Sequence, residues 1–301
     1  MKSRVAVTAG DNRAENIEKA LALIEEDIDL TGKTDVFIKV NFVDTVIEPA
    51  VTHPDSVRVL LEFLRKRYSG KISIGESVMM EPVEETFEHF GYLDILKEYN
   101  VSMVDMKEGT WEVFQLYDKD FRKIDIHYSR EMLRSDYLIS IGPPKTHDAV
   151  TVTLSVKNIV MGGVSHKHDD KHKMHAGPQA MNLDLCLLAK EHLADLAIID
   201  GYVAMEGDGP VHGDPFEWKI AVASCDAVTT DALTAGMMGF DYTGVGYIWY
   251  LHKLGCGNGD PEQMEILGEN PDTYRRQFKP HSWYEWQKTW PDERARKILG
   301  I

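Results

Sequence analysis

The segment spanning residues 142–177 concentrates side chains that could bind an anion or a metal. It holds five of the twelve histidines, and five lysines against three aspartates, in a chain whose formal net charge is −16. Because a positive cleft raises the local concentration of anions, this basic segment predicts a site for a small anionic molecule. Neutral imidazoles in the same segment could also ligate a metal or accept a proton near pH 7.

Lys145 and His147 are the first candidates for catalysis within this segment. They follow Pro143 and Pro144, whose restricted backbone should hold the chain extended. Side chains two residues apart in an extended chain point the same way, so both should face one pocket, with Thr146 facing away. A neighbouring lysine disfavours the imidazolium, so we expect His147 to stay neutral, as a base or a ligand. The alternative is a surface lysine beside a capping histidine.

Polar residues also follow several predicted strands. Ligands bind beyond the carboxyl ends of strands in open α/β sheets, so a site shared by several strand ends is predicted. The expected anion-binding residues are Lys39, Asn41, Lys157 and Asn158. The expected catalytic residues are His147, Lys145, Asp200 and Glu206. The alternative is that each strand simply ends in a polar turn, as strands usually do.

Four histidines have spacings that could gather several imidazoles around one ion. They are His166, His168, His172 and His175, and a divalent metal is the cofactor that they would suit. The alternative is a solvated and mobile lid, hinged at Gly162 and Gly163, whose basic side chains face water.

A second glycine-rich stretch, residues 201–214, follows the strand that ends at Asp200. Its glycines would let the backbone approach a ligand closely, and Glu206, Asp208 and His212 could ligate a metal or move a proton. A plain hairpin connection explains the stretch equally well. The chain contains no G-x-G-x-x-G, G-x-x-x-x-G-K-[ST], G-x-S-x-G or H-E-x-x-H motif, so no nucleotide, hydrolase or zincin signature is present.

The elements that must position these residues follow an α/β pattern. Short apolar runs alternate with amphipathic segments in the first half, which predicts a mostly parallel sheet covered by helices on both faces. Two alternating runs in residues 112–127 flank Asp118-Lys119-Asp120 and predict an inserted β-hairpin. We expect one α/β domain over residues 1–301, with residues 270–301 as a helical extension packed on it.

Composition narrows the classes of protein. A net charge of −16 argues against nucleic acid and anionic membranes as partners. Cys186, Cys225 and Cys256 are odd in number and far apart, which argues against a disulfide framework and favours the cytoplasm. We also expect no membrane-spanning helix and no signal peptide, because no long apolar run occurs. An oligomer is compatible with the composition.

Several motifs together resemble a known family. They are FIKVNF (37–42), THP (52–54), GES (75–77), PKTH (144–147), SVKN (155–158), DG (200–201), MEGDGP (205–210) and DAV (226–228) with Asp231. In this order, over residues 5–240, the chain resembles the domain of unknown function 362 family. Many members carry a ferredoxin-type segment with two iron–sulfur clusters. This chain has no C-x-x-C-x-x-C run, so no cluster is expected here.

The layout is also distantly similar to the nickel-pincer lactate racemase superfamily. That similarity implies an anionic site lined by lysines and histidines, and it identifies no individual residue. Three hypotheses follow from the sequence. The chain is an enzyme acting on a small carboxylated or phosphorylated substrate, a non-catalytic metal or cofactor carrier, or, by family habit, a redox protein.

Overall fold

One large sheet organises the chain. The computed structural model describes residues 2–43, 47–78 and 82–301. Within these residues, ten strands form one sheet. Eight of them pair in the order β12-β1-β11-β10-β7-β2-β3-β4, and β8 pairs with β10 and β9 with β8. The strands are β1 (Ser3–Ala9), β2 (Asp35–Lys39), β3 (Lys71–Glu76), β4 (Ser102–Asp105), β7 (Tyr137–Gly142), β8 (Lys145–His147), β9 (Thr151–Thr153), β10 (Leu196–Glu206), β11 (Asp214–Ser224) and β12 (Met264–Gly268). The five strands from β4 to β10 run parallel, and β11 is antiparallel to both of its neighbours.

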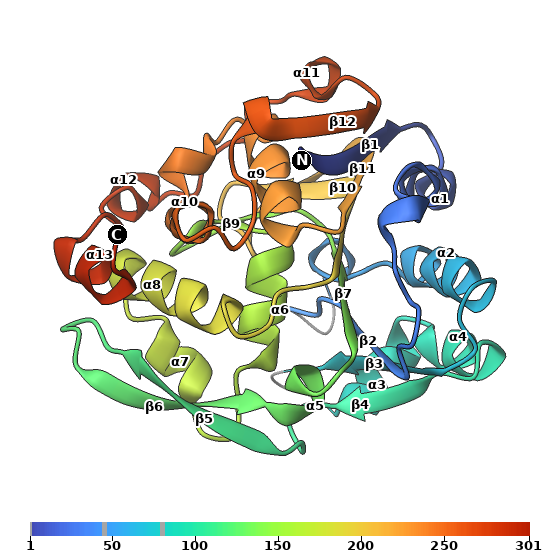
Figure 1. Cartoon of the computed structure of the whole chain (residues 1–301), viewed down its shortest axis with the longest axis horizontal. Helices are drawn as coiled ribbons and strands as arrows, with labels where there is room; N and C mark the ends of the chain where they lie inside the picture. The colour runs from blue at the N-terminus through green and yellow to red at the C-terminus, as the bar shows by residue number, and fades with distance from the viewer. Residues whose placement is uncertain (1, 44–46, 79–81) are drawn as a thin grey trace.

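Helices cover both faces of this sheet, as predicted. The helices are α1 (Arg13–Leu23), α2 (Pro54–Arg65), α3 (Val83–His89), α4 (Tyr92–Glu98), α5 (Arg130–Leu133), α6 (Ser155–Gly163), α7 (Asp170–Met174), α8 (Pro178–Ala189), α9 (Ala227–Met237), α10 (Gly246–Lys253), α11 (Pro271–Tyr274), α12 (Tyr284–Gln287) and α13 (Glu293–Leu299). Helices α1, α2 and α4 lie on one side of the sheet, and α6, α8, α9 and α10 lie on the other (Figure 1).

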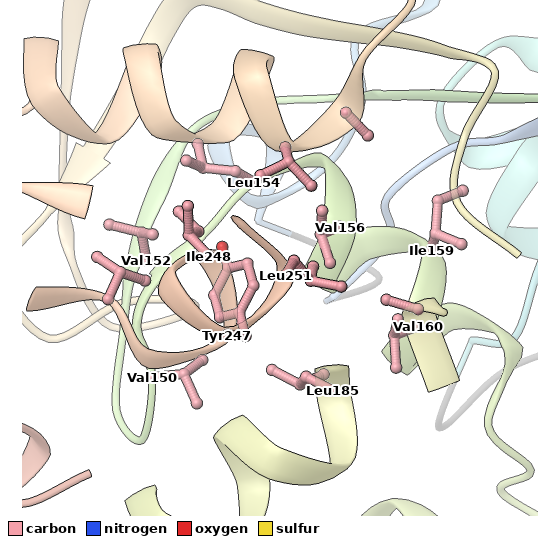
Figure 2. Packing of buried hydrophobic residues seen from close by; sticks show 14 of the residues in the cluster. Val150, Val152, Leu154, Val156, Ile159, Val160, Leu185, Tyr247, Ile248 and Leu251 are labelled. Carbon is pink, nitrogen blue, oxygen red and sulfur yellow. The ribbon is translucent and has the colours of Figure 1, made fainter. Parts of the chain in front are cut away.

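The two faces of the sheet bury two separate cores. Along β10, Ala197 and Ile199 belong to the core with α6 and α8, whereas Leu196 and Ile198 belong to the core with α1 and α2. This alternation follows from the two-residue repeat of a strand. Figure 2 shows the first core, where valines and leucines of the β8–β9 region and α6 pack against Tyr247 of α10 and Leu185 of α8.

The inserted hairpin is confirmed. Strands β5 (Trp111–Tyr117) and β6 (Lys123–Ser129) pair antiparallel, apart from the large sheet. The hairpin is tied to α8 through Asp184, whose Oδ1 accepts a hydrogen bond from the Tyr117 amide at 3.1 Å. Asp184 is fully buried, so this contact lies in the interior rather than at the surface.

The glycine-rich stretch after Asp200 is a hairpin between two long strands. Strand β10 does not stop at Asp200 but continues to Glu206, and pairs with β11 with one irregularity between Gly201 and Val203. A Cβ atom at Gly201 would lie 2.6 Å from Cγ1 of Ile220. This glycine is therefore needed for the close approach of β11, and the hairpin connection expected as one of the two alternatives is present.

The C-terminal segment packs against the helices of the first core. The Trp290 ring lies 5.2 Å from the Tyr250 ring and 5.6 Å from the Trp249 ring, both on α10. That residues 1–301 form a single domain stays a prediction. Within the described ranges, none of the helices has the length and apolar character needed to cross a bilayer.

Candidate functional site

A cavity of about 440 Å³ opens where β2 and β3 end and α6 begins. The position agrees with the rule that ligands bind beyond the carboxyl ends of parallel strands. Its lining comes from the ends of β2, β3 and β8, from α6, and from the segment around α7. The lining residues are Lys39, Asn41, Phe42, Val43, Glu76, Ser77, His147, Asp148, Thr153, Lys157, Asn158, Met161, Gly162, His166, Lys171, His172, His175 and Pro210.

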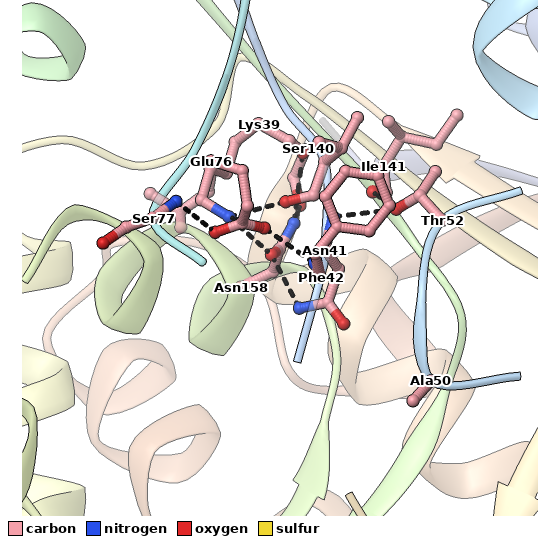
Figure 3. Close-up of polar contacts among 12 residues, drawn as sticks. Lys39, Asn41, Phe42, Ala50, Thr52, Glu76, Ser77, Ser140, Ile141 and Asn158 are labelled. Carbon is pink, nitrogen blue, oxygen red and sulfur yellow. Dashed lines mark hydrogen bonds and ion pairs between the residues drawn. The ribbon is translucent and has the colours of Figure 1, made fainter. Parts of the chain in front are cut away.

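Lys39 and Glu76 form a buried ion pair in the wall of the cavity (Figure 3). The Lys39 Nζ donates to Glu76 Oε2 at 2.8 Å and to the Val40 carbonyl at 2.6 Å. Burial lowers the pKa of Lys39, and the Glu76 carboxylate opposes this. A Cβ at Gly162 would lie 2.0 Å from Lys39 Cε. Gly162 thus makes room for the lysine, and Gly162 and Gly163 form the C-terminal end of α6; that they act as a hinge stays a prediction.

Asn41 and Asn158 form the next part of the wall. Asn41 Nδ2 donates to Asn158 Oδ1 at 3.0 Å, and the Asn41 amide donates to Thr52 Oγ1 at 2.8 Å. Behind them lies Lys145, fully buried, whose Nζ donates to Asn41 Oδ1 at 2.5 Å and to the Ala50 carbonyl at 2.7 Å. Lys145 therefore fixes the position of Asn41.

The expectation that Lys145 and His147 both face the pocket holds for His147 alone, because Lys145 does not line the cavity. An ammonium group without water needs acceptors, and Lys145 finds them beneath Asn41. Burial, and Lys157 in second place, lower the pKa of Lys145 well below its usual value. Thr146 does face away, donating to the Gly207 carbonyl at 2.8 Å.

Lys157 differs from the other cavity lysines in having no partner. Its side chain is 7% exposed, it lines the cavity, and within the described ranges no hydrogen bond or ion pair engages its ammonium group. Burial lowers the pKa of Lys157 to about 8, with Asp148 opposing the shift and Lys39 adding to it. Lys171 is a second weakly held cation: its Nζ donates to the Ser77 carbonyl at 3.3 Å, and burial lowers its pKa to about 7.

Helix α6, which carries Lys157, is anchored at its start by a residue of α9. Asp231 accepts hydrogen bonds from the Ser155 and Val156 amides at 2.8 and 3.0 Å. These amides belong to the first turn of α6, whose N–H groups have no partners within the helix. The contact fixes the first turn of α6, where Lys157 lies.

Three histidines of the cavity wall, His147, His166 and His175, have lowered pKa values that favour the neutral imidazole. Burial, followed by the charge of Lys157, lowers the pKa of His147 to about 3. The neutrality expected for His147 thus comes from burial and Lys157 rather than from Lys145. Burial also lowers the pKa of His166 to about 3 and lowers that of His175.

The four histidines predicted as one metal site do not meet in the described part of the chain. His166, His172 and His175 line the cavity, whereas His168 does not and stacks on His127 with ring centroids 3.7 Å apart. Across the described ranges, potential ligand atoms lie within 4.8 Å of one another in two groups of three or more. These groups are His147 with Asp148 and His175, and His127 with His168 and Asp170.

Asp200 and Glu206 lie outside the cavity lining. Asp200 is 3.1 Å from Arg13 Nε and accepts from Ser56 Oγ at 2.5 Å. It sits two residues after Ile198, on the face that packs against α1 and α2, whereas the cavity lies on the α6 side. Glu206 instead pairs with Arg276 at 3.3 Å. The structure does not bring these two carboxylates to the predicted site.

Three residues at the site had no individual role predicted from the sequence: Asp148 and Lys171 line the cavity, and Gln287 lies outside the lining but contacts it. Glu76 ends the strand next to Lys39, and parallel pairing of β2 with β3 places them together. Asp148 and Lys171 lie in the basic segment. Gln287 comes from the C-terminal segment: its Nε2 donates to the carbonyls of His147 and Asp148 at 2.6 and 2.9 Å. No sequence pattern signals this last contact.

By its fold and its cavity, the chain is an α/β protein with a lysine- and histidine-lined cavity at the carboxyl ends of a parallel sheet. The chain belongs to the DUF362 family, described as a domain of unknown function, whose model matches residues 36–236. This confirms the resemblance seen in the motifs. A thylakoid-associated protein of Synechocystis sp. is 30% identical over 235 residues, which cover 77% of this chain and 70% of that protein.

Solved structures resemble the chain in fold. The lactate racemase apoprotein from Thermoanaerobacterium thermosaccharolyticum superposes with a TM-score of 0.52 at 13% identity, over 79% of this chain. The match spans 57% of the length of that racemase chain. A protein from Thermotoga maritima has a TM-score of 0.48 at 15% identity, over 69% of this chain and 54% of its own. The distant similarity of fold to lactate racemase is confirmed, and at this identity it shows the fold alone.

Proposed function

We propose that this protein is an enzyme that binds a small carboxylated or phosphorylated molecule in the cavity, with Lys157 holding the anionic group. The supporting observation is Lys157, a largely buried side chain that lines the cavity and whose ammonium group has no partner among the described residues. Burial of most of this side chain lowers the pKa of Lys157, so a negative charge bound beside its ammonium group would stabilise the charged form. An anionic ligand would supply the missing charge and hydrogen-bond acceptors.

The charges around Lys157 favour an anion over a cation at this position. Lys39 and Glu76 neutralise each other at 2.8 Å, which leaves Lys157 and Lys171 facing Asp148 in the cavity wall. A local excess of positive charge within a chain at −16 concentrates anions at this place and not over the rest of the surface.

Proton transfer is the chemistry that the remaining groups support. His147 and His166 line the cavity as neutral imidazoles, and their pKa values of about 3 make them weak bases in the empty site. A bound anion would raise the pKa of a ring beside it, and that ring could then accept a proton from the substrate. Lys157 would hold the substrate, and one of these two rings would act as the base. Lys145, expected from sequence to be catalytic, would act through Asn41 as a positioning residue.

Thermal unfolding with a panel of hydroxy acids, oxo acids and phosphates tests the proposal. The melting temperature of the wild type should rise with at least one class of anion, and Lys157→Met should lose that rise. Lys167→Met is the matched control, because Lys167 lies in the same basic segment but its side chain is 60% exposed and outside the lining. A wild type that responds to none of these anions, or a Lys157→Met variant that responds equally, would refute the proposal.

A non-catalytic metal carrier is the second candidate, favoured by the group of His147, Asp148 and His175 in the cavity wall. A carrier would bind metal without converting any anion that binds, so turnover of a bound anion separates the two.

We also propose that the protein works in the cytoplasm on a small molecule, rather than on nucleic acid or a membrane surface. The association with thylakoids belongs to the name of the relative in Synechocystis and is not transferred to this chain.

A further inference from the structure

Three residues of the cavity wall bring potential metal ligands together. His147 ends β8, Asp148 follows it, and His175 lies just after α7. One ligand atom from each lies within 4.8 Å of the other two, and all three residues line the cavity. We infer that His147, Asp148 and His175 bind a divalent transition-metal cation. This set differs from the four histidines expected from the sequence.

The hydrogen bond of His175 leaves one ring nitrogen available to a metal. Its Nδ1 lies 2.6 Å from the carbonyl oxygen of Lys171, and because a carbonyl only accepts, Nδ1 carries the proton. The Nε2 atom of the neutral ring therefore holds a free lone pair. Histidines that ligate metals are usually oriented in this way, by donating their other nitrogen to a carbonyl or carboxylate.

Asp148 supplies a buried oxygen that lacks a donor. The Ala149 amide donates to Nδ1 of His147 at 3.0 Å, so that nitrogen has no proton for Asp148 Oδ1, which is also 3.0 Å away. Because Nε2 then carries the proton of the neutral ring, His147 would ligate the cation through Nδ1, in place of its contact with the Ala149 amide. Asp148 Oδ1 is buried and has no hydrogen-bond partner among the described residues. A cation would give this oxygen the positive partner that it lacks.

In the second histidine–aspartate group, the carboxylate oxygens already accept hydrogen bonds from other side chains. Asp170 is fully buried, and its two oxygens already accept from Lys173 at 2.6 Å and from His127 Nδ1 at 2.8 Å. The His127 and His168 rings stack nearly parallel, at 9°. Parallel stacked rings do not converge on one ion, so this group serves packing and provides a control.

Two imidazoles and one carboxylate suit zinc, nickel or cobalt better than magnesium or calcium, which prefer oxygen ligands. Three protein ligands leave coordination positions open, and Lys157 lies in the wall of the same cavity. The inference deepens the proposed function: an anionic substrate would reach both the cation and Lys157. With His147 engaged as a ligand, His166 remains as the neutral base of the cavity.

Cobalt binding to the full chain, after removal of metal by a chelator, tests the inference. Titration calorimetry and the visible absorption of bound Co²⁺ should show one site per chain. Both His175→Ala and Asp148→Asn should weaken binding by about tenfold or more, whereas His168→Ala should bind like the wild type. His175 is exposed at the mouth of the cavity, although neighbouring protein atoms desolvate its ring enough to lower its pKa. Its replacement should therefore leave the fold intact, and circular dichroism checks this.

Two results would overturn the inference: a wild type that binds none of Co²⁺, Zn²⁺ and Ni²⁺, or a His175→Ala variant that binds Co²⁺ as tightly as the wild type. Lys157→Met separates the inference from the proposed function, because this variant should lose the anion and keep the cobalt site. If the wild type binds the anion but no cobalt, the metal site is rejected and the anion site stands. If the wild type binds cobalt but responds to no anion, the anion site is rejected and the metal site stands.

Discussion

At the scale of single residues, the charge state of Lys157 links the proposed function to pH. Its pKa is lowered to about 8 by burial, with Asp148 and Lys39 as the nearby charges. The charged form, which predominates below this pH, is the form that attracts an anion. The positive charge is lost as the pH rises through 8.

Anion affinity should therefore decrease slightly through pH 7, where Lys171 loses its charge, and should fall more steeply above pH 8, approaching about tenfold per pH unit once Lys157 is mostly neutral. Titration calorimetry with the best anion of the panel, from about pH 6.5 to about pH 9.5, measures this. Lys157→Arg is the informative comparison, because arginine keeps its charge over this range. If the affinity of the wild type stays constant up to the highest pH, Lys157 does not hold the anion.

At this scale, the sequence predicted site residues correctly where the type of residue was itself the evidence for a role. Lys39, Asn41, Lys157, Asn158 and His147 were expected at the site and do line the cavity. It failed for Asp200 for a reason present in the sequence. Asp200 and Ile198 point to the same face of β10, and that face packs against α1 and α2. The alternation of a strand thus excludes Asp200 from the α6 face, but only once the cavity is known to lie there.

At the scale of secondary structure, α6 is the element on which the site depends most. It carries Lys157, Asn158, Met161 and Gly162 into the cavity wall. Its glycines looked like a hinge in the sequence, because a glycine pair beside a basic loop permits bending. In the structure they permit close contact: a Cβ at Gly163 would lie 2.3 Å from Tyr128 Cζ. No local pattern distinguishes these two uses of glycine, since the neighbours come from distant segments.

Gly162→Ala should therefore be destabilising, although alanine favours helices. The added methyl group would lie 2.0 Å from Lys39 Cε, so the buried Lys39 side chain must shift from the position in which it pairs with Glu76, and overpacking of this kind costs about 1–3 kcal/mol. Gly236→Ala in α9 is the control, since a Cβ at Gly236 would have no atom within 4 Å, and it should stabilise the helix by up to about 1 kcal/mol. Urea unfolding of both variants measures the difference. Equal free energies of unfolding would contradict this account of Gly162.

At the scale of the whole molecule, the order of strands and helices along the chain was easier to predict than the pairing of the strands in the sheet. Alternating strands and helices indicated a covered parallel sheet, and the sheet confirms this. Its strand order was not predicted, because β11 inserts between β1 and β10 by pairing antiparallel to both. Such a pairing depends on contacts between residues far apart in sequence.

The attachment of the β5–β6 hairpin to the rest of the molecule should depend on pH. Burial raises the pKa of Asp184 to about 8, against an ordinary value of 3.8, and the Tyr117 amide opposes the shift. Between these values the folded protein holds a proton that the unfolded chain releases. The free energy of unfolding should therefore fall as the pH rises from about 4 to about 8, by up to ~1.4 kcal/mol per pH unit.

Asp184→Asn keeps an acceptor for the Tyr117 amide and removes the titration. Its free energy of unfolding should change less with pH than that of the wild type, so the variant should gain relative stability at pH 8. Urea unfolding at pH 6 and pH 8 gives the comparison. Parallel pH profiles for the two proteins would show that Asp184 does not hold a proton in the folded state.

Gln287 of α12 holds the backbone of His147 and Asp148 in place, yet it lies fifty-one residues beyond 236, where the family match ends. One wall of the site is thus braced by a part of the chain that the family definition does not include. Relatives can therefore share every motif of the matched region and still differ in what they bind, because their tails can differ independently. An excised domain cut at the family boundary would keep the lysines and lose this support, so ligand specificity in such proteins should be studied on chains that retain their own C-terminal segments.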